Sequence, residues 1–205
     1  DSQSKDTSTG VDVHFDEVKE GRLTPRCVLM DLEPSTLDAF LTSKVGGLFD
    51  PEGAVITGKY GGSNNFARGM YGEGADLMGS VTDRIRYLIE RSSTRMEGFQ
   101  LVHALAGGTG SGAGSLLLEQ LRDEYGPKRV ILTHTLLPST QSSEVLVEPY
   151  NAVLASHSLI AMSDMTVLHG KPSTTHLLTI FSLFLPFRLF PTSPYLCPPL
   201  FPEFL

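Results

Sequence analysis

The stretch Phe99–Tyr125, FQLVHALAGGTGSGAGSLLLEQLRDEY, contains a strand, a glycine-rich loop and a helix in immediate succession. Phe99–Ala106 is a short, mostly apolar run, typical of a buried strand. Five glycines fall within the eight residues Gly107–Gly114. Ser115–Tyr125 then carries leucines at helical spacing. The sequence therefore places a dense run of glycines at the point where a strand passes into a helix.

The same alternation continues on both sides of this stretch. Further strands are expected at Cys27–Met30, Arg129–Leu137 and Met165–His169. Further helices are expected at residues 35–41, 71–92 and 149–163. Ser35 or Thr36 is expected to cap the first of these helices. The last should bury an apolar side made of Val153, Leu154, Leu159 and Ile160. Repeated strand and helix segments predict an α/β fold, a Rossmann-like parallel sheet with helices on both faces.

Composition and charge exclude several function classes. The 205 residues carry 16 Lys+Arg against 23 Asp+Glu, a net charge of -7, which argues against a nucleic-acid-binding surface. Cys27 and Cys197 form no CxxC pair, so we expect no disulfide framework or zinc site, and a reducing compartment. No apolar signal segment follows Asp1, and prolines interrupt the longest low-charge run, so we expect no membrane span.

Composition changes abruptly near Gly170. All 20 glycines lie in residues 1–170, whereas residues 171–205 hold 7 of the 13 prolines. The prolines argue against a long helix or a central strand in this tail. A translated intron or a shifted reading frame explains the tail better than a Pro-rich ligand does, because no PxxP there has the usual basic flank.

Ligands bind outside the carboxyl ends of the strands in parallel sheets, and four turns at such positions are candidates. The strongest is Ala106–Gly112, where glycines permit close backbone approach and the N–H groups of the helix start, with the Thr109 and Ser111 hydroxyls, suit a phosphate. Residues 108–113 also match G-x-G-x-x-A, but the next strand ends without the acidic residue that would hold a ribose. No P-loop sequence occurs.

The other three turns supply carboxylates and amides. Asp31 and Glu33 fall on one side of an extended segment, where they suit hydrated Mg²⁺ beside phosphates; a solvated strand end explains them equally well. Residues 58–69 combine glycines and amides suited to a second cradle, or form a plain loop. Glu144 and Glu148 suit sugar hydroxyls, although acidic residues at a helix N-terminus are the simpler interpretation of each.

Together these turns resemble the nucleotide pocket of the tubulin family, whose signature loop reads AGGTGSG here. The matching segments, in the family's order and spacing, are MDLEP (30–34), GGSNNFARG (61–69), MEGFQLVHALAGGTGSGAGSLLLEQLRDEY (96–125) and VEPYNAVL (147–154). The resemblance covers roughly residues 11–169. Within the family, HALAGGTGSGAGSLLLEQL, LFDPEG and DVHFDEVKEGRLTPRCVLMDLEP are most similar to gamma-tubulin.

The resemblance implies GTP or GDP and Mg²⁺ as cofactors. It implies the nucleotide-binding residues Ala106, Gly107, Gly108, Thr109, Gly110, Ser111, Gly112, Asp31, Glu33, Asn64, Glu144 and Glu148. Asp31 and Glu33 would face the phosphate and magnesium end, with Glu33 reaching Mg²⁺ through water. Asn64 would lie near the terminal phosphate, and Glu144 and Glu148 near the ribose. His103 is expected in the core.

The function implied is a gamma-tubulin-like protein that nucleates microtubules at organising centres in the cytoplasm. Its partners would be tubulin subunits and gamma-tubulin complex proteins, with no nucleic acid or membrane. An alpha- or beta-like polymer subunit is the alternative within the family. Outside it, the alternatives are a Rossmann dinucleotide oxidoreductase and an inactive truncated product.

Parts of the family pattern have no match in this sequence, namely the first strand with its phosphate loop, the base-recognising central helix, the second domain and the segment with the hydrolytic acid. No catalytic residue is therefore assigned. We expect a disordered start (1–10), a partial tubulin-type nucleotide-binding domain (11–170) and an unrelated, unstructured tail (171–205). We also expect this chain alone to bind guanine nucleotide poorly and to aggregate.

Overall fold

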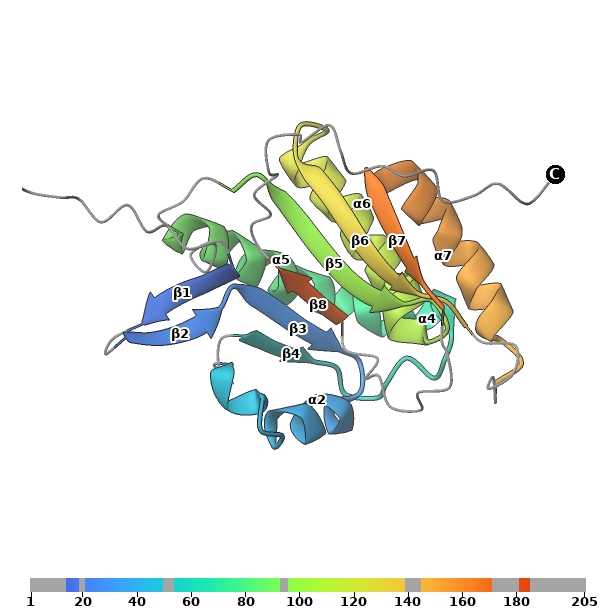
Figure 1. Cartoon of the computed structure of the whole chain (residues 1–205). Helices are drawn as coiled ribbons and strands as arrows, with labels where there is room; N and C mark the ends of the chain where they lie inside the picture. The colour runs from blue at the N-terminus through green and yellow to red at the C-terminus, as the bar shows by residue number, and fades with distance from the viewer. Residues whose placement is uncertain are drawn as a thin grey trace, which may run out of the picture.

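The computed structural model describes residues 14–18, 21–49, 54–92, 96–138, 145–170 and 181–184. In these residues, six strands form a sheet in the order β4-β3-β8-β5-β6-β7 (Figure 1). Two parallel groups make up most of it. One pairs β3 (Cys27–Asp31) with β4 (Val55–Thr57), and the other joins β5 (Gly98–Ala104), β6 (Val130–Leu136) and β7 (Met165–His169). A separate antiparallel hairpin consists of β1 (Phe15–Val18) and β2 (Arg22–Pro25).

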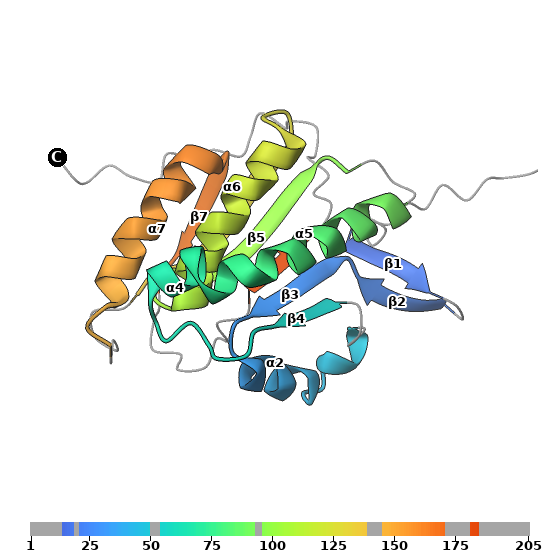
Figure 2. The same ribbon diagram turned by 180° about the vertical axis from the view of Figure 1, so that it is seen from behind.

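Helices cover both faces of the sheet, which confirms the expected α/β fold. On one face lies α2 (Pro34–Leu41), followed by the short 3₁₀ turn η2 (Gly46–Leu48). Figure 2 shows the other face, which carries α4 (Phe66–Tyr71), α5 (Glu73–Arg91), α6 (Gly114–Tyr125) and α7 (Glu148–Met162). A π-helical turn, η3 (Thr109–Ala113), leads into α6. None of the helices in the described ranges is long and apolar enough to cross a membrane.

The apolar core forms two clusters, one on each face of β3. Val28 and Met30 belong to the larger cluster, together with the buried side chains of α5 and α6. Cys27 and Leu29 belong to the smaller one, together with Leu37 of α2. Because successive side chains of a strand point to opposite faces, a strand buried on both sides reads as an unbroken apolar run. All five residues of β3 are accordingly buried.

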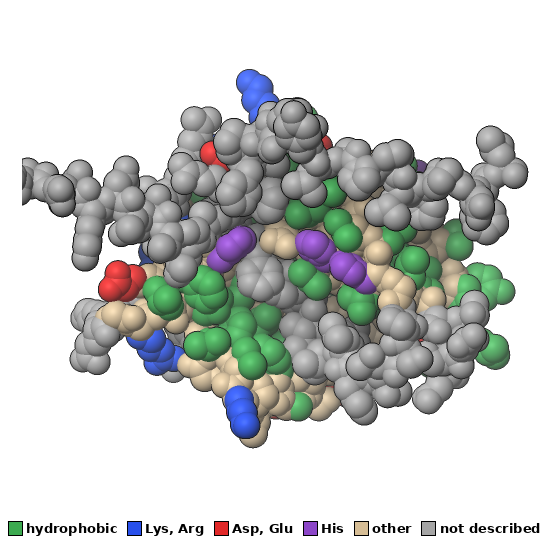
Figure 3. Space-filling model, in the orientation of Figure 1, with side chains coloured by type: hydrophobic (Ala, Val, Ile, Leu, Met, Phe, Trp, Pro, Cys, Tyr) green, Lys and Arg blue, Asp and Glu red, His purple; other side chains and the backbone are tan. Residues whose placement is uncertain are grey.

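In the view of Figure 1, β6 and β7 lie in front of α6 and α7. Figure 3 shows hydrophobic and histidine side chains gathered on this side of the molecule. The rings of His134 and His169 stack there with centroids 5.4 Å apart. His134 Nδ1 lies 3.1 Å from His169 Nε2. Burial and the neighbouring His169 together lower the pKa of His134.

Two sequence expectations about helices are wrong in detail. Ser35 and Thr36 do not cap α2, because the helix begins earlier, at Pro34 with Glu33 as its N-cap, and proline is well suited to the first helical position. The second is the expected apolar side of α7. Three of its four residues are not buried, since Val153 is 73%, Leu154 51% and Ile160 85% exposed.

The buried side of α7 is made of Leu159, as expected, and otherwise of small and polar residues. Asn151, Ala155, Ser158 and Leu159 are buried. Small side chains let α7 lie close to α6, and Ser158 donates a hydrogen bond to Glu119 of that helix at 3.1 Å. Hydrophobic periodicity does not detect such a face, because two of its four residues are polar.

The expectation that the tail forms no regular element is wrong for β8 (Phe181–Phe184). This segment pairs antiparallel with both β3 and β5, so it is a central strand of the sheet. The prolines of the tail argue against a central strand in general, but these four residues contain none. The rest of the tail and the expected disordered start at 1–10 lie outside the described residues.

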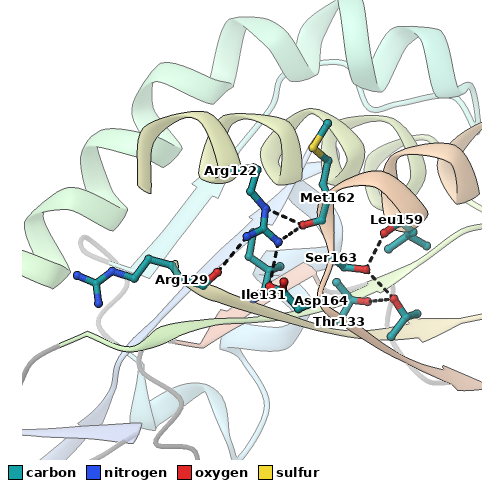
Figure 4. Close-up of polar contacts among 9 residues, drawn as sticks. Arg122, Arg129, Ile131, Thr133, Leu159, Met162, Ser163 and Asp164 are labelled. Atoms are coloured by element: carbon teal, nitrogen blue, oxygen red, sulfur yellow. Dashed lines mark hydrogen bonds and ion pairs between the residues drawn. The ribbon is translucent and has the colours of Figure 1, made fainter. Parts of the chain in front are cut away.

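The amino ends of β6 and β7 are held together by one arginine (Figure 4). Arg122 of α6 donates hydrogen bonds to the carbonyl oxygens of Met162 and Arg129, at 3.0 and 3.1 Å, and to Asp164 Oδ2 at 2.9 Å. The same carboxylate oxygen accepts the Ile131 N–H at 2.8 Å. Burial tends to raise the pKa of Asp164, but the Ile131 N–H and Arg122 outweigh it and leave the pKa below its usual value.

We expect Arg122→Ala to lower the free energy of unfolding by about 2 kcal/mol, because it removes the side-chain donor of two partly buried carbonyl groups and the cationic partner of Asp164. Arg86→Ala is the matched control. Arg86 also forms an ion pair with a carboxylate, Glu124 at 2.9 Å, but half of its side chain is exposed, so its loss should leave the urea midpoint nearly unchanged. Equal effects of the two substitutions would contradict the structural role of Arg122.

Candidate functional site

A cavity of about 160 Å³ lies at the carboxyl ends of β3 and β5. Three segments meet there: the end of β3 and the start of α2, the turn before α4, and the loop after β5. The residues that line the cavity are Asp31, Glu33, Thr36, Gly62, Ser63, Asn64, Gly107, Gly108 and Thr109. Parallel α/β sheets place their ligands at this edge.

One hydrogen bond joins the first and third of these segments. Thr109 Oγ1 donates to Asp31 Oδ1 at 2.9 Å, and both residues are 5% exposed. The same carboxylate oxygen accepts the Glu33 N–H at 3.2 Å. Burial raises the pKa of Asp31, and these hydrogen bonds act in the opposite direction. The Asp31 carboxylate therefore has protein partners that hold the β3 turn against the loop.

Glu33 differs from Asp31 although both line the cavity. Its side chain is exposed, and Oε1 accepts a hydrogen bond from the Ser35 hydroxyl at 2.8 Å. Within the described residues there is no group of three or more Asp, Glu, His or Cys side chains that could hold a metal by themselves. One buried and one exposed carboxylate beside a phosphate-sized space suit Mg²⁺, which usually takes one or two carboxylates plus substrate phosphates and waters.

The glycines of the loop are needed for contacts within the protein itself. A Cβ on Gly108 would lie 2.7 Å from Gly62 O, and one on Gly110 would lie 2.2 Å from Ala104 O. A Cβ on Gly112 would lie 2.2 Å from Phe66 O. These glycines allow neighbouring backbone segments of the chain to pack in direct contact. Bulky residues at these positions would disrupt the fold, so they do not test ligand binding.

A buried histidine holds the π-helical turn η3 against the sheet. His103, on β5, is 2% exposed, and its Nδ1 lies 2.8 Å from Gly110 O. Its Nε2 lies 3.0 Å from Thr135 Oγ1 on β6. A neutral imidazole that donates to the Gly110 carbonyl and accepts from the threonine satisfies both contacts. Burial lowers the pKa of His103 to about 4, and the side chain lies in the core, as the sequence indicates.

The turn before α4 presents Ser63 and Asn64 to the cavity. Both have positive φ, +48° and +49°, and such left-handed residues are uncommon outside glycine, with asparagine enriched among them. The next residue, Asn65, caps α4 by accepting the Ala67 N–H at 2.9 Å. The sequence interpretation of residues 58–69 as a loop misses this short helix.

Asn151 of α7 joins three segments around the cavity and is not among the site residues predicted from the sequence. Its Nδ2 donates to Asn64 O and to Ala106 O, both at 2.8 Å, and its Oδ1 accepts the Phe66 N–H at 3.1 Å. The side chain is 4% exposed. The only signal in the sequence is a polar residue on the buried side of an amphipathic helix, inside the segment VEPYNAVL.

The structure brings together six of the expected site residues, Asp31, Glu33, Asn64, Gly107, Gly108 and Thr109. Gly110, Ser111 and Gly112 are buried in η3, and Ala106 contributes its carbonyl to Asn151. Glu148 begins α7 and is not among the residues that line the cavity. Glu144 lies outside the described residues. The nucleotide contacts of all twelve remain predictions.

Comparison with known proteins gives one family match and several relatives. The model of the Tubulin/FtsZ family, GTPase domain, matches residues 2–170. The chain is 48% identical over 159 residues to the tubulin beta-2 chain of Geotrichum candidum, which covers 78% of this chain and 34% of that protein. It is 46% identical over 154 residues to the tubulin beta-8 chain of Oryza sativa subsp. japonica. These residues make up 75% of this chain and 34% of that protein.

A third relative, the tubulin beta-6 chain of Gallus gallus, is 46% identical over 156 residues, 76% of this chain and 34% of that protein. The chain therefore spans about one third of the length of these relatives. All three are beta chains. The similarity favours the alpha- or beta-like alternative and does not support the narrower expectation of a gamma-type nucleating protein at organising centres.

We expect the fold to become less stable in acid because of the buried His103. Its pKa is lowered from 6.5 to about 4 in the folded state, so the unfolded chain binds the extra proton first, and stability falls as the pH drops from about 6.5 towards 4. Between pH 7 and pH 5 the loss should be about 2 kcal/mol, measured by urea unfolding. His103→Gln should remove most of this pH dependence. His134→Gln, at the partly exposed pair, is the control and should remove much less.

Proposed function

The chain belongs to the Tubulin/FtsZ family, and we propose that the cavity at Asp31, Asn64 and Gly107–Thr109 holds the phosphate end of GTP or GDP. The observation that carries the proposal is the meeting of a glycine-rich helix start, a left-handed amide-bearing turn and two carboxylates around one small space. The N–H groups in the first turn of a helix have no partner within the helix, and with the helix dipole they favour an anion.

Each side of the cavity has a separate task in this proposal. Gly107–Thr109 and the turn at Ser63 and Asn64 would surround the phosphates. Glu33 would hold Mg²⁺, through water, at the carboxylate side, and the ion would supply positive charge that neutralises the phosphate oxygens. Asp31 would act mainly by positioning, since its carboxylate already accepts hydrogen bonds from Thr109 and from the Glu33 N–H.

We propose that the complete protein is an alpha- or beta-like tubulin subunit that assembles with other tubulin subunits in the cytoskeleton. The three beta-chain relatives support this proposal. Gamma-type nucleation rests only on the wording of the segments HALAGGTGSGAGSLLLEQL, LFDPEG and DVHFDEVKEGRLTPRCVLMDLEP. A dinucleotide oxidoreductase is disfavoured because β6 is followed by Leu137 and Pro138, where an acidic residue would be needed for the ribose.

Two variants that each add one negative charge test the phosphate site. Asn64→Asp keeps the shape of the side chain, and aspartate also tolerates the left-handed backbone, but it places a negative charge beside the cavity. Asn65→Asp changes the neighbouring residue in the same way and keeps an N-cap that suits α4 equally well. Asn64→Asp should weaken GTP binding at least tenfold, and Asn65→Asp should weaken it much less.

Binding should be followed by amide chemical shifts of the ¹⁵N-labelled 205-residue chain, a measurement that also detects millimolar affinity. GTP with Mg²⁺ should shift the amides of Asn64, Gly107 and Thr109 first. NAD⁺ at the same concentration should leave them in place. Unchanged amides in 10 mM GTP, or equal effects of the two aspartate variants, would refute the site.

A further inference from the structure

The strand β8 joins the two halves of the sheet. On one side it pairs with β3, where Cys27 faces Phe184 and Met30 faces Phe181. On the other side it pairs with β5, where Val102 faces Ser182. The strand order places β8 between β3 and β5, so in the described residues these two parallel groups meet only through it. The position between β3 and β5 is therefore a gap that this four-residue segment fills.

The gap lies in the interior of the sheet. Val28, Leu29 and Met30 on one side and Leu101 on the other are at most 1% exposed. A strand without a neighbour leaves its N–H and C=O groups unpaired, and in a buried position each such group is destabilising. The edges of β3 and β5 therefore favour any extended segment that can pair with both of them.

The direction of β8 shows that a strand can fill this gap without running parallel to its neighbours. Its neighbours β3 and β5 belong to parallel groups, yet β8 runs antiparallel to both. The stretch Ser173–Leu185 lies between Pro172 and Pro186 and contains no proline. Every residue of β8 can thus donate its N–H to a neighbouring strand, which a proline cannot do.

The backbone pairing of β8 with β3 and β5 does not require that all three strands belong to the same chain. β7, the strand that precedes β8 in the sequence, lies at the far edge of the sheet, and β5 and β6 stand between them. All described strand pairings of β8 are with β3 and β5, which are distant in sequence. The same backbone hydrogen bonds would form if the segment came from another molecule, which is the condition for exchange of identical elements between copies.

We propose that the gap between β3 and β5 is a strand-binding site, and that Phe181–Phe184 of a second copy of this chain can occupy it in place of the chain's own segment. The occupant is a short, extended, apolar and proline-free peptide. Exchange between two copies gives a dimer in which each sheet is completed by the other chain. This inference does not depend on nucleotide binding.

A single substitution places a second cysteine opposite Cys27. Phe184 is the Cα partner of Cys27, and Cα atoms of antiparallel partners are about 4.5–5.5 Å apart, within the range for a disulfide. We would use Phe184→Cys with Cys197→Ser. The control is Leu183→Cys with Cys197→Ser, because neighbouring residues of a strand point to opposite faces. Burial raises the pKa of Cys27 to about 12, so the disulfide should be formed during refolding in glutathione buffer.

Refolding an equal mixture of ¹⁴N and ¹⁵N chains identifies the source of the strand. Mass spectrometry of the linked peptides should show a 27–184 disulfide for Phe184→Cys, with a mixed-isotope fraction that rises with protein concentration. The Leu183→Cys chain should give at least tenfold less 27–183 disulfide. A link found only between peptides of the same isotope would overturn the exchange. No 27–184 link, or equal links in the two variants, would overturn the site itself.

A second measurement leaves the chain unchanged in case the cysteine variants do not fold. The 205-residue chain is refolded with an excess of the fluorescent peptide TIFSLFL, which has the sequence of residues 179–185. At least tenfold more of this peptide should remain bound after gel filtration than of TIFPLFL, whose proline removes a backbone donor. Equal retention of the two peptides would contradict strand pairing.

Discussion

Close contact between backbones at glycine positions determines how the carboxyl edge of the sheet is built. A Cβ on Gly69 would lie 2.1 Å from Gly108 O, and a Cβ on Gly74 would lie 1.8 Å from Gly69 O. Together with Gly110 and Gly112, these residues let α4, the start of α5 and the π-helical turn η3 pack without side chains between them. The positions of Thr109 and Asn64 at the cavity follow from this packing, because both residues extend from backbones fixed by glycine contacts.

Polar side chains then connect the segments that the glycines bring together. Thr109 holds the turn after β3, Asn151 holds the turn before α4, and His103 holds η3 against β5 and β6. Each of these side chains is buried and has at least two partners, as buried polar groups require. The candidate site is therefore organised by contacts within the protein itself.

Much of this arrangement could be predicted from the sequence, and the exceptions have physical reasons. Apolar periodicity located α5, α6 and the strands β3, β5, β6 and β7 to within a few residues. It placed α7 to within one residue but mispredicted its buried side, which is made of Leu159 and of small and polar residues. It also failed for β8, since a strand paired on both sides is determined by the gap in the sheet and not by its own four residues.

The candidate site could also be predicted only in part from the sequence. The glycine-rich loop and the carboxylates Asp31 and Glu33 were found from residue type and position alone. Asn151 was not, because its role depends on contacts with residues 85 and 87 positions away. The structure adds a second reason for the glycines, since close approach to the protein's own backbone needs the same residue as close approach to a ligand.

The Arg122 network gives α6 a mechanical role. This helix of 12 residues, about 18 Å long, starts at η3 beside the cavity and carries Arg122 near its other end. Arg122 ties that end to the β6 and β7 strands through carbonyl groups and Asp164. With that end tied, a displacement of the glycine loop at the start of α6 would tilt the helix about its Arg122 end.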